Sequence, residues 1–243
     1  MADAQGFTAR LGVITPSGNV VVERVTAAVL AGTPTVSAHY ARIAVRGAVD
    51  PFPDSYDIEG MLTAARLLAD ARPDIIFWNG SKGAAIGLGH DRALAAAITA
   101  ETGIPATTSI IVLHDLLIAT GAKRVGLATP FRPPYQERLP AELARWGVAT
   151  VAASHAGLSD NLSYASVPPE RILAQIDEAA AARPDAVLTV CTNYAAAFVA
   201  AEAERRTGVA VYDTTLLPIW HALTVAGHDT APLASRWGSL FSR

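Results

Sequence analysis

Arg72-Pro-Asp-Ile-Ile-Phe-Trp-Asn-Gly-Ser81 decides the fold, because the chain repeats its pattern 111 residues later as Arg183-Pro-Asp-Ala-Val-Leu-Thr-Val-Cys-Thr192. Each copy is a short, continuously apolar run that leads into small and polar residues. This pattern is typical of a strand that is buried on both faces and ends at a loop. The copies differ where the first has Gly80 and the second has Cys191, the only cysteine of the sequence.

The repeat extends beyond these two segments. Leu11-Gly-Val-Ile-Thr-Pro16 recurs as Val125-Gly-Leu-Ala-Thr-Pro130, and Thr102-Gly-Ile-Pro105 recurs as Thr207-Gly-Val-Ala210. The three pairs keep their order, with offsets of 114, 111 and 105 residues. We therefore infer that a unit of roughly 110 residues was duplicated, a period too long for a solenoid.

Short apolar runs alternate with longer segments rich in Ala, Leu and Glu. Strands that alternate with helices indicate βαβ units and mainly parallel sheets. The predicted fold class is α/β, with two pseudo-symmetric βαβ-type halves, 1–118 and 119–243, an active site in the cleft between them, and termini that can cross over. The expected strands are 11–15, 75–78, 124–128 and 186–190, and the expected helices are 19–30, 58–71, 91–102, 136–146, 169–182 and 194–207.

Composition excludes several classes of protein. Apolar residues make up 51% of the chain and charged residues 17%, which excludes an intrinsically disordered chain. The net charge of -3, without a Lys/Arg cluster, predicts no nucleic-acid or membrane partner. Residues 1–7 lack the regions of a signal peptide and one cysteine cannot form an internal disulfide, so we expect a cytoplasmic protein. The tail 237–243 is a candidate contact between subunits of a homo-oligomer.

Four loops follow the predicted strands, and they are the first place to look for a ligand. They are Pro16-Ser-Gly-Asn19, Gly80-Ser-Lys-Gly83, Pro130-Phe-Arg-Pro133 and Cys191-Thr-Asn-Tyr194. In α/β sheets, ligands bind outside the carboxyl ends of the strands. A helix that begins behind such a loop offers free N–H groups and a positive dipole end. We therefore expect an anionic ligand, a small carboxylate.

Cys191 has two interpretations. A lone cysteine on a buried strand is most often a small hydrophobic residue. Here the cysteine ends its apolar run before Thr192-Asn193, so we expect it to face a loop near a helix N-terminus, where the pKa of a thiol falls. Its repeat partner, Gly80, also lies at a strand end. These two features favour a functional thiol.

Five segments resemble the aspartate/glutamate racemase superfamily, and within it the maleate cis-trans isomerases and arylmalonate decarboxylases. The resemblance covers nearly the whole chain and implies two pseudo-symmetric α/β halves that use no metal or organic cofactor. That implication agrees with the duplication. The segments are Gly12-Val-Ile-Thr-Pro-Ser-Gly-Asn19, Gly80-Ser81, Gly126-Leu-Ala-Thr-Pro130, Asp160-Asn161 and Cys191-Thr192.

The resemblance also implies a mechanism. Racemases and maleate isomerases of this superfamily bring one cysteine from each half, whereas the decarboxylases have a glycine first and a cysteine second, as Gly80 and Cys191 are here. The resemblance therefore implies loss of CO₂ from a malonate-type acid and protonation of the enediolate by one thiol. One alternative is an isomerase or racemase in which Lys82 or a tyrosine replaces the second thiol. Another is a non-catalytic carboxylate-binding protein.

The same resemblance assigns substrate contacts. Gly80-Ser81 and Thr192 match the family's pocket for the developing dioxyanion, which preorganised donors would stabilise. Asn19 and Asn161 match positions where maleate isomerases bind a substrate carboxylate, and decarboxylases lack that pair. The chain thus mixes features of both subfamilies.

Departures from the family pattern concern three residues. Phe131 stands where the family has a tyrosine and can donate no hydrogen bond, so Tyr135, Tyr164 or Tyr194 is a candidate replacement. Lys82 stands where a small hydroxylated residue is expected, and it is either an acid, a partner for an extra carboxylate, or a solvated loop residue. Asn193 either contacts substrate or caps the next helix. The candidate catalytic residues are Cys191 and Lys82, and the candidate substrate-binding residues are Asn19, Pro16, Gly80, Ser81, Phe131, Tyr135, Asn161, Thr192 and Asn193.

Other chemistry has weaker support in the sequence. The glycine-rich segment 83–89 fits neither the dinucleotide fingerprint nor the P-loop. His90-Asp91 is either a general base with its orienting carboxylate or the start of a helix. The histidines show no metal-ligand spacing, so we expect no metal and no cofactor.

Overall fold

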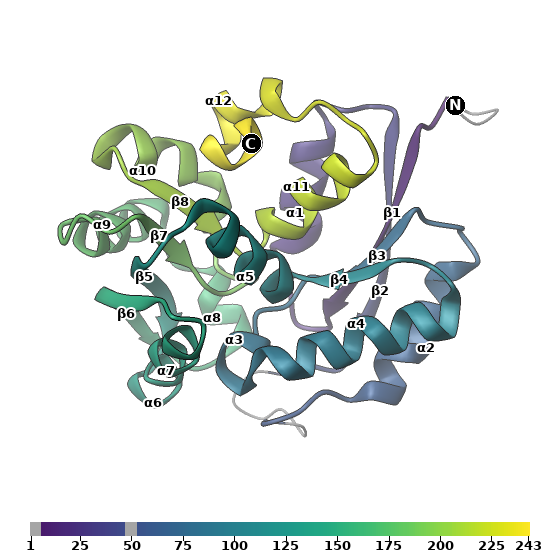
Figure 1. The fold of residues 1–243 in the computed structure, drawn as a ribbon, viewed down its shortest axis with the longest axis horizontal. Helices are drawn as coiled ribbons and strands as arrows, with labels where there is room; N and C mark the ends of the chain where they lie inside the picture. Colours follow the sequence, from purple (N-terminus) through teal and green to yellow (C-terminus); the bar gives the residue numbers. More distant parts are fainter. Residues whose placement is uncertain (1–5, 47–52) are drawn as a thin grey trace.

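The computed structural model describes residues 6–46 and 53–243, and these residues contain two four-stranded parallel sheets (Figure 1). The strand orders are β2-β1-β3-β4 and β6-β5-β7-β8, so the two sheets share one topology. The predicted α/β fold class is confirmed. Residues 1–5, part of the segment used above to argue against a signal peptide, lie outside the described residues. The strands are β1 (Ala9–Pro16), β2 (Val36–Ile43), β3 (Ile75–Trp78), β4 (Ala106–Thr108), β5 (Arg124–Phe131), β6 (Ala149–Leu158), β7 (Ala186–Thr189) and β8 (Ala210–Asp213).

Helices connect the strands and flank both sheets (Figure 1). Within the described part of the chain, no helix is long and apolar enough to cross a membrane. The α-helices are α1 (Val22–Leu30), α2 (Ile58–Ala69), α3 (Gly83–Ile86), α4 (Leu88–Thr102), α5 (Ser109–Thr120), α6 (Pro133–Gln136), α7 (Arg138–Arg145), α8 (Asn161–Ala165), α9 (Pro169–Ala180), α10 (Ala200–Thr207), α11 (Leu216–Val225) and α12 (Ala234–Trp237). The 3₁₀ turns are η2 (Ala195–Phe198), η3 (Ala231–Leu233) and η4 (Ser239–Ser242).

The duplicated Arg-Pro-Asp segments adopt the same conformation in both halves. Arg72 and Arg183 have φ values of 48° and 47°, a left-handed conformation that side chains rarely adopt. Each following aspartate accepts a hydrogen bond from the start of the neighbouring strand: Asp74 from the N–H of Arg10 and Asp185 from the N–H of Arg124. The repeat inferred from sequence is therefore also a repeat of turn geometry.

One glycine of the repeated Gly-Val/Gly-Leu motif is explained by packing. A Cβ on Gly126 of β5 would lie 2.6 Å from the carbonyl oxygen of Ala179 in α9. The backbone of α9 thus lies against the strand at a distance that no other residue allows. This contact holds α9 on the second sheet.

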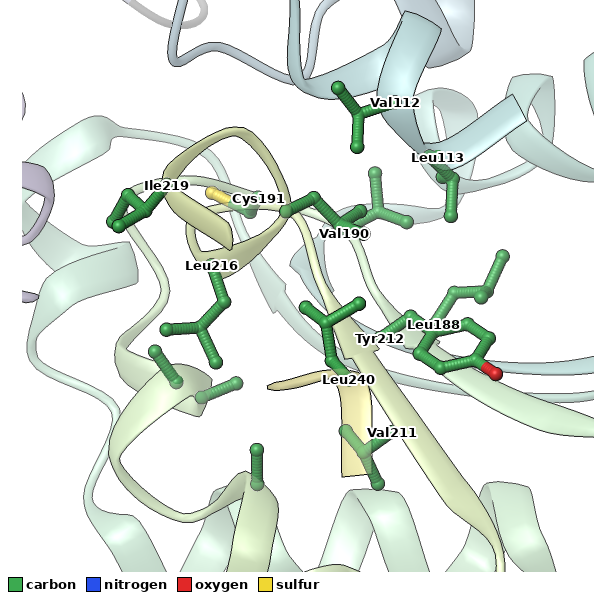
Figure 2. Close-up of a cluster of buried hydrophobic side chains, with 14 of the residues drawn as sticks. Val112, Leu113, Leu188, Val190, Cys191, Val211, Tyr212, Leu216, Ile219 and Leu240 are labelled. Carbon is green, nitrogen blue, oxygen red and sulfur yellow. The ribbon is translucent and has the colours of Figure 1, made fainter. Parts of the chain in front are cut away.

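Alternate side chains of the first sheet enter two different cores, as expected from the period of a strand. Val13 and Phe77 belong to a large core that continues into the second half, whereas Ile14 and Trp78 pack in a smaller core with α2 and α4. In the large core, side chains of α5, β7, β8 and α11 meet beside Cys191 (Figure 2). Because the large core contains residues of both halves, their relative position is fixed by packing.

The C-terminal tail packs on its own chain. Trp237, Leu240 and Phe241 are buried in the large core, and η4 contacts β8 and α11. These apolar side chains are covered by their own chain, and that packing does not test a contact with a neighbouring subunit, which stays a prediction. A homo-oligomer stays a prediction.

Two expected helices are divided in the structure. The segment 136–146 forms α6 and α7, which meet at Glu137. Pro140 has no N–H to donate to a carbonyl one turn earlier, so it is accommodated in the first turn of a new helix. The segment 194–207 begins with η2, and α10 starts only at Ala200. The four predicted strands are confirmed, and β1 and β5 extend beyond the predicted ends.

Candidate active site

A cavity of about 340 Å³ lies where the carboxyl ends of both sheets meet. In each sheet the chain leaves a central strand, β1 or β5, toward one edge and returns to its other side as β3 or β7. Such a switch point leaves a crevice beside the strand ends. Gly80 and Cys191 each lie two residues beyond their strands, because β3 ends at Trp78 and β7 at Thr189.

The cavity brings together the eleven residues proposed from the sequence as catalytic or substrate-binding. Its walls include Pro16, Asn19, Gly80, Ser81, Lys82, Phe131, Tyr135, Asn161, Cys191, Thr192 and Asn193. Ten further residues line the cavity that were not among the eleven, although the sequence placed Arg132 in a candidate ligand loop and named Tyr164 as a candidate hydroxyl. They are Val45, Pro53, Asp54, Trp78, Arg132, Pro134, Arg138, Leu158, Ser159 and Tyr164. Arg132 and Pro134 had a usable signal, because they follow the end of β5.

Cys191 is buried in the wall of this cavity, with 5% of its surface exposed. Its N–H donates to Oγ1 of Thr214 over 3.1 Å, which fixes the backbone that carries the thiol. Burial raises the pKa of the Cys191 thiol to about 12; the N–H groups of Asn193 and Tyr194 lower it, and the carboxylate of Asp213 raises it further. The expectation of a lowered pKa is wrong because burial outweighs the N–H groups. At neutral pH the sulfur therefore carries a proton that it can donate.

Asp213, at the end of β8, accepts three hydrogen bonds behind Cys191. One oxygen accepts from the hydroxyl of Thr189 at 2.7 Å, and the other accepts from the N–H groups of Thr215 and Leu216 at 2.9 and 3.1 Å. Burial raises the pKa of this carboxyl to about 6, while the hydrogen bonds lower it. The network ties the end of β8 to β7.

Gly80 leaves space that Trp78 fills. A Cβ at Gly80 would lie 2.2 Å from Cε2 and Cζ2 of the Trp78 indole. The indole is fully buried and packs edge-to-face on Tyr56, with ring centroids 6.1 Å apart. The first half thus presents an aromatic ring, rather than a thiol, beside Gly80.

Asp91 is a buried carboxyl behind this wall. Its Oδ2 accepts from the Tyr56 hydroxyl at 2.9 Å, and a Cβ at Gly83 would lie 1.6 Å from the same oxygen. The glycine at 83 therefore makes room for a carboxyl. Asp91 does not line the cavity, which argues against His90-Asp91 as a catalytic pair.

Asp91 should make the free energy of unfolding depend on pH. Burial raises its pKa in the folded protein to about 7, above the ordinary value for an aspartate. Below about pH 3 the carboxyl is protonated in both the folded and the unfolded state; as pH rises toward 7, only the unfolded state loses its proton, so stability falls by on the order of 4 kcal/mol. In Asp91→Asn this part of the decline should disappear. Urea unfolding from pH 4 to 8 measures it, with the exposed Asp70→Asn as control; an unchanged decline in Asp91→Asn would contradict the assignment.

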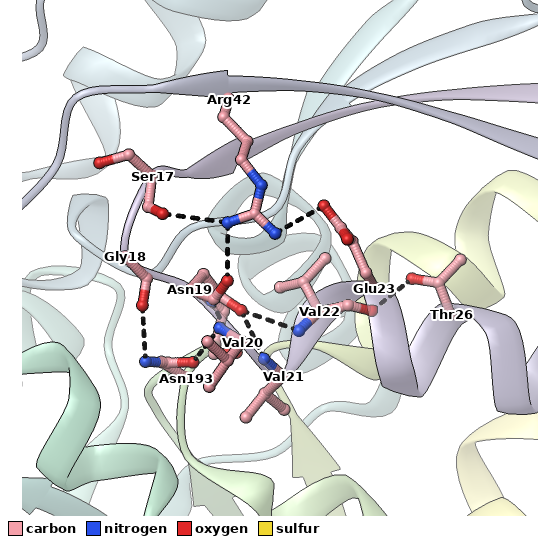
Figure 3. A network of polar contacts seen from close by, with 11 residues as sticks. Ser17, Gly18, Asn19, Val20, Val21, Val22, Glu23, Thr26, Arg42 and Asn193 are labelled. Atoms are coloured by element: carbon pink, nitrogen blue, oxygen red, sulfur yellow. Dashed lines mark hydrogen bonds and ion pairs between the residues drawn. The ribbon is translucent and has the colours of Figure 1, made fainter.

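Two asparagines join the loops of the two halves (Figure 3). Asn19 donates to the carbonyl of Thr192 over 3.0 Å, and its Oδ1 accepts from two N–H groups at the start of α1. Asn193 accepts from the N–H of Val20 over 2.8 Å and donates to the carbonyls of Gly18 and Asn161. The prediction that Asn193 caps the following helix is therefore wrong, because its side chain crosses to the other half.

Asn161 begins α8 and also contacts the first half. Its amide nitrogen donates to the carbonyl of Val45 over 3.2 Å, while Asp160 caps the helix by accepting from the N–H of Ser163. Asn161 thus lines the cavity from the second half while bonded to the first.

The aromatic wall decides which tyrosine can supply a hydroxyl. The Phe131 ring lies 4.6 Å from that of Tyr135 and 5.4 Å from that of Tyr164, between centroids, and all three line the cavity. Tyr194 does not line it, and its hydroxyl donates to Gln175 over 2.8 Å. Burial, followed by the nearby Cys191, raises the pKa of Tyr164, which keeps its hydroxyl protonated. Tyr135 and Tyr164 therefore remain as candidate donors.

A family model described as arylmalonate decarboxylase matches residues 52–241. The chain belongs to the arylmalonate decarboxylase family. The arylmalonate decarboxylase of Bordetella bronchiseptica is 29% identical over 198 residues, which cover 78% of this chain and 80% of that protein. The chain therefore belongs to an enzyme family.

Solved structures agree with this family fold. The maleate cis-trans isomerase of Nocardia farcinica, bound to TRIS, has a TM-score of 0.84 at 23% identity, covering 96% of this chain and 97% of that one. An arylmalonate decarboxylase structure has a TM-score of 0.78 at 24% identity, covering 96% and 99%. The arylmalonate decarboxylase family thus shares its fold with maleate isomerases. Across residues 6–46 and 53–243, no group of three or more His, Cys, Asp or Glu side chains could hold a metal.

Proposed function

We propose that this protein is a cofactor-independent decarboxylase of a small malonate-type acid, in which Cys191 protonates an enediolate. The observation that carries the proposal is one buried, protonated thiol in a cavity whose other strand end has Gly80. A nucleophilic mechanism would need a thiolate, which burial disfavours. Proton donation needs the neutral thiol, which burial favours.

The step breaks the bond between the substrate's α carbon and one carboxylate, and CO₂ leaves. The electron pair remains on the substrate as an enediolate shared with the remaining carboxylate. The Cys191 thiol then gives its proton to the α carbon, which forms the new C–H bond, and the thiolate recovers a proton from water. Because one fixed acid reaches one face, a single enantiomer is expected.

Residues around the sulfur and the enediolate support this step. The N–H groups of Asn193 and Tyr194 lower the pKa of the thiol, so they stabilise the thiolate left after proton transfer. Gly80-Ser81 and Thr192 border the cavity, where donors could meet the enediolate oxygens. The Tyr164 hydroxyl is our candidate for the donor that Phe131 lacks. These assignments follow from shared position in the cavity.

Incubation with α-methyl-α-phenylmalonate, whose product has a stereocentre at the α carbon, and with maleate in D₂O tests the proposal. We expect CO₂ release from the malonate and one deuterium at the α carbon of a single product enantiomer, read by NMR and chiral chromatography. Conversion of maleate to its trans isomer, without CO₂ release from any malonate, would favour the isomerase instead. Tight binding of both acids without turnover would favour a carboxylate-binding protein.

An isomerase or racemase is the second candidate, and one observation favours it. Asn19, Asn161 and Lys82 line the same cavity as Cys191. In such a mechanism Lys82 or a tyrosine would replace the second thiol. Lys82→Met should abolish an isomerisation in which Lys82 is the second group but leave the chemical step of a single-thiol decarboxylase in place.

A further inference from the structure

Charge is distributed unevenly between the cavity and the whole protein. The chain carries a net charge of -3, yet the described residues that line the cavity include three cations, Lys82, Arg132 and Arg138, and one anion, Asp54. Asp54 is already bound, because its carboxylate lies 2.6 Å from the Arg138 guanidinium. Among the described residues that line the cavity, cations therefore outnumber anions, whereas the whole chain is anionic.

Arg132 is the cation that stands out. It follows the last residue of β5, and its side chain forms no ion pair with any residue in 6–46 or 53–243. It also lies close enough to Tyr164 to lower the pKa of that phenol, against the larger effects of burial and Cys191. Arg132 is thus an exposed residue that lines the cavity and lies near Tyr164.

Lys82 lies in another wall of the same cavity. It precedes α3, and its Nζ is 5.9 Å from the centre of the Tyr56 ring. The loops after β3 and β5 therefore each bring a cation to one small space.

We propose that the natural substrate carries an anionic group in addition to its malonate-type carboxylates, and that Arg132 binds this group. The inference rests on the proposed function and narrows its substrate class to tricarboxylates and similarly charged acids. Arginine presents a planar fork of donors that matches a carboxylate with two parallel hydrogen bonds. An uncharged aryl or alkyl substituent would leave the guanidinium without this partner.

Two substrates that differ by one carboxylate test the inference: propylmalonate and (2-carboxyethyl)malonate. In the wild-type protein we expect kcat/KM to be about 10- to 100-fold higher for the carboxylated acid, the usual range for a hydrogen-bonded charge pair. Arg132→Gln should lower kcat/KM for the carboxylated acid and leave that for propylmalonate unchanged, so that the ratio falls to near one. Arg132→Lys should recover part of the ratio, since it keeps the charge but loses the fork.

Arg124→Gln is the matched control. Arg124 begins the same strand at the opposite end of the sheet and donates to the carbonyl of Ala182. The Arg124→Gln substitution removes the same charge far from the cavity, so the ratio of kcat/KM for the two acids should stay at the wild-type value. Equal use of the two acids by the wild type, or a ratio that persists in Arg132→Gln, would overturn the inference.

Binding measurements distinguish a failure of this inference from a failure of the proposed function. If the wild type decarboxylates neither acid, calorimetry still compares their affinities. Tighter binding of the carboxylated acid that is lost in Arg132→Gln would uphold the anion site and overturn decarboxylation. Equal affinities would overturn the anion site.

Discussion

Cys191→Ala is expected to lower decarboxylation about 1,000-fold, because a positioned general acid contributes roughly 10²- to 10⁴-fold. The substitution removes the only proton donor assigned to the reacting face and little volume from the wall. Substrate affinity and unfolding temperature should therefore change much less than turnover. The measurements are CO₂ release, substrate binding by calorimetry and thermal unfolding.

Cys191→Ser is the matched variant, because it keeps the shape but replaces the thiol with a far weaker acid. It should be nearly as inactive as Cys191→Ala. The sole cysteine also allows a direct check with iodoacetamide: since burial raises the pKa of the thiol to about 12, alkylation should accelerate up to at least pH 10 without a plateau. Full activity in either variant, or a plateau near pH 8, would rule out an acidic role for a protonated thiol.

Gly80→Cys is expected to have two effects, one on the stereochemistry of the product and one on the stability of the protein. A second thiol across the cavity would protonate the opposite face and so allow a racemic product. The same substitution places its Cβ 2.2 Å from the Trp78 indole, which packs against Tyr56 and cannot simply rotate away. Overpacking of this kind typically costs about 1–3 kcal/mol. The single variant should therefore be less stable, with a displaced indole.

The double variant Trp78→Leu with Gly80→Cys should give room for the new side chain. We expect it to form both product enantiomers and to exchange the α hydrogen of the product with D₂O. Trp78→Leu alone is the control; it should lose stability but still give one enantiomer. Chiral chromatography and urea unfolding are the measurements. One enantiomer from a folded double variant would contradict the opposed arrangement of positions 80 and 191, and unchanged stability in Gly80→Cys would contradict the position of the indole.

The central strands could be predicted from the sequence because burial on both faces leaves a continuous apolar run. That signal is present in β3 and β7, in which every residue is buried. The edge strands β2 and β6 are partly exposed and show no such run. The strand β4 has only three residues, two of them threonines, and β8 ends in Asp213, so neither shows a continuous apolar run.

The sequence predicts those residues of the candidate site that directly follow a strand. Cys191 and Gly80 were found because chain order fixes them to the strand ends. Arg138 was missed because it reaches the cavity from a helix that the sequence did not place there. The bonding of Asn193 and the raised pKa of Cys191 depend on tertiary contacts, namely the approach of Val20 and burial in a shared core.

The asparagine contacts between the halves fix the position of the loop that carries the thiol. Asn19 donates to the carbonyl of Thr192, which follows Cys191, and Asn193 accepts from the N–H of Val20 in the first half. Because these bonds join groups of the chain itself, the direction from which the proposed acid approaches does not depend on the shape of the substrate. We therefore expect substrates of different size to yield the same handedness even where their rates differ widely.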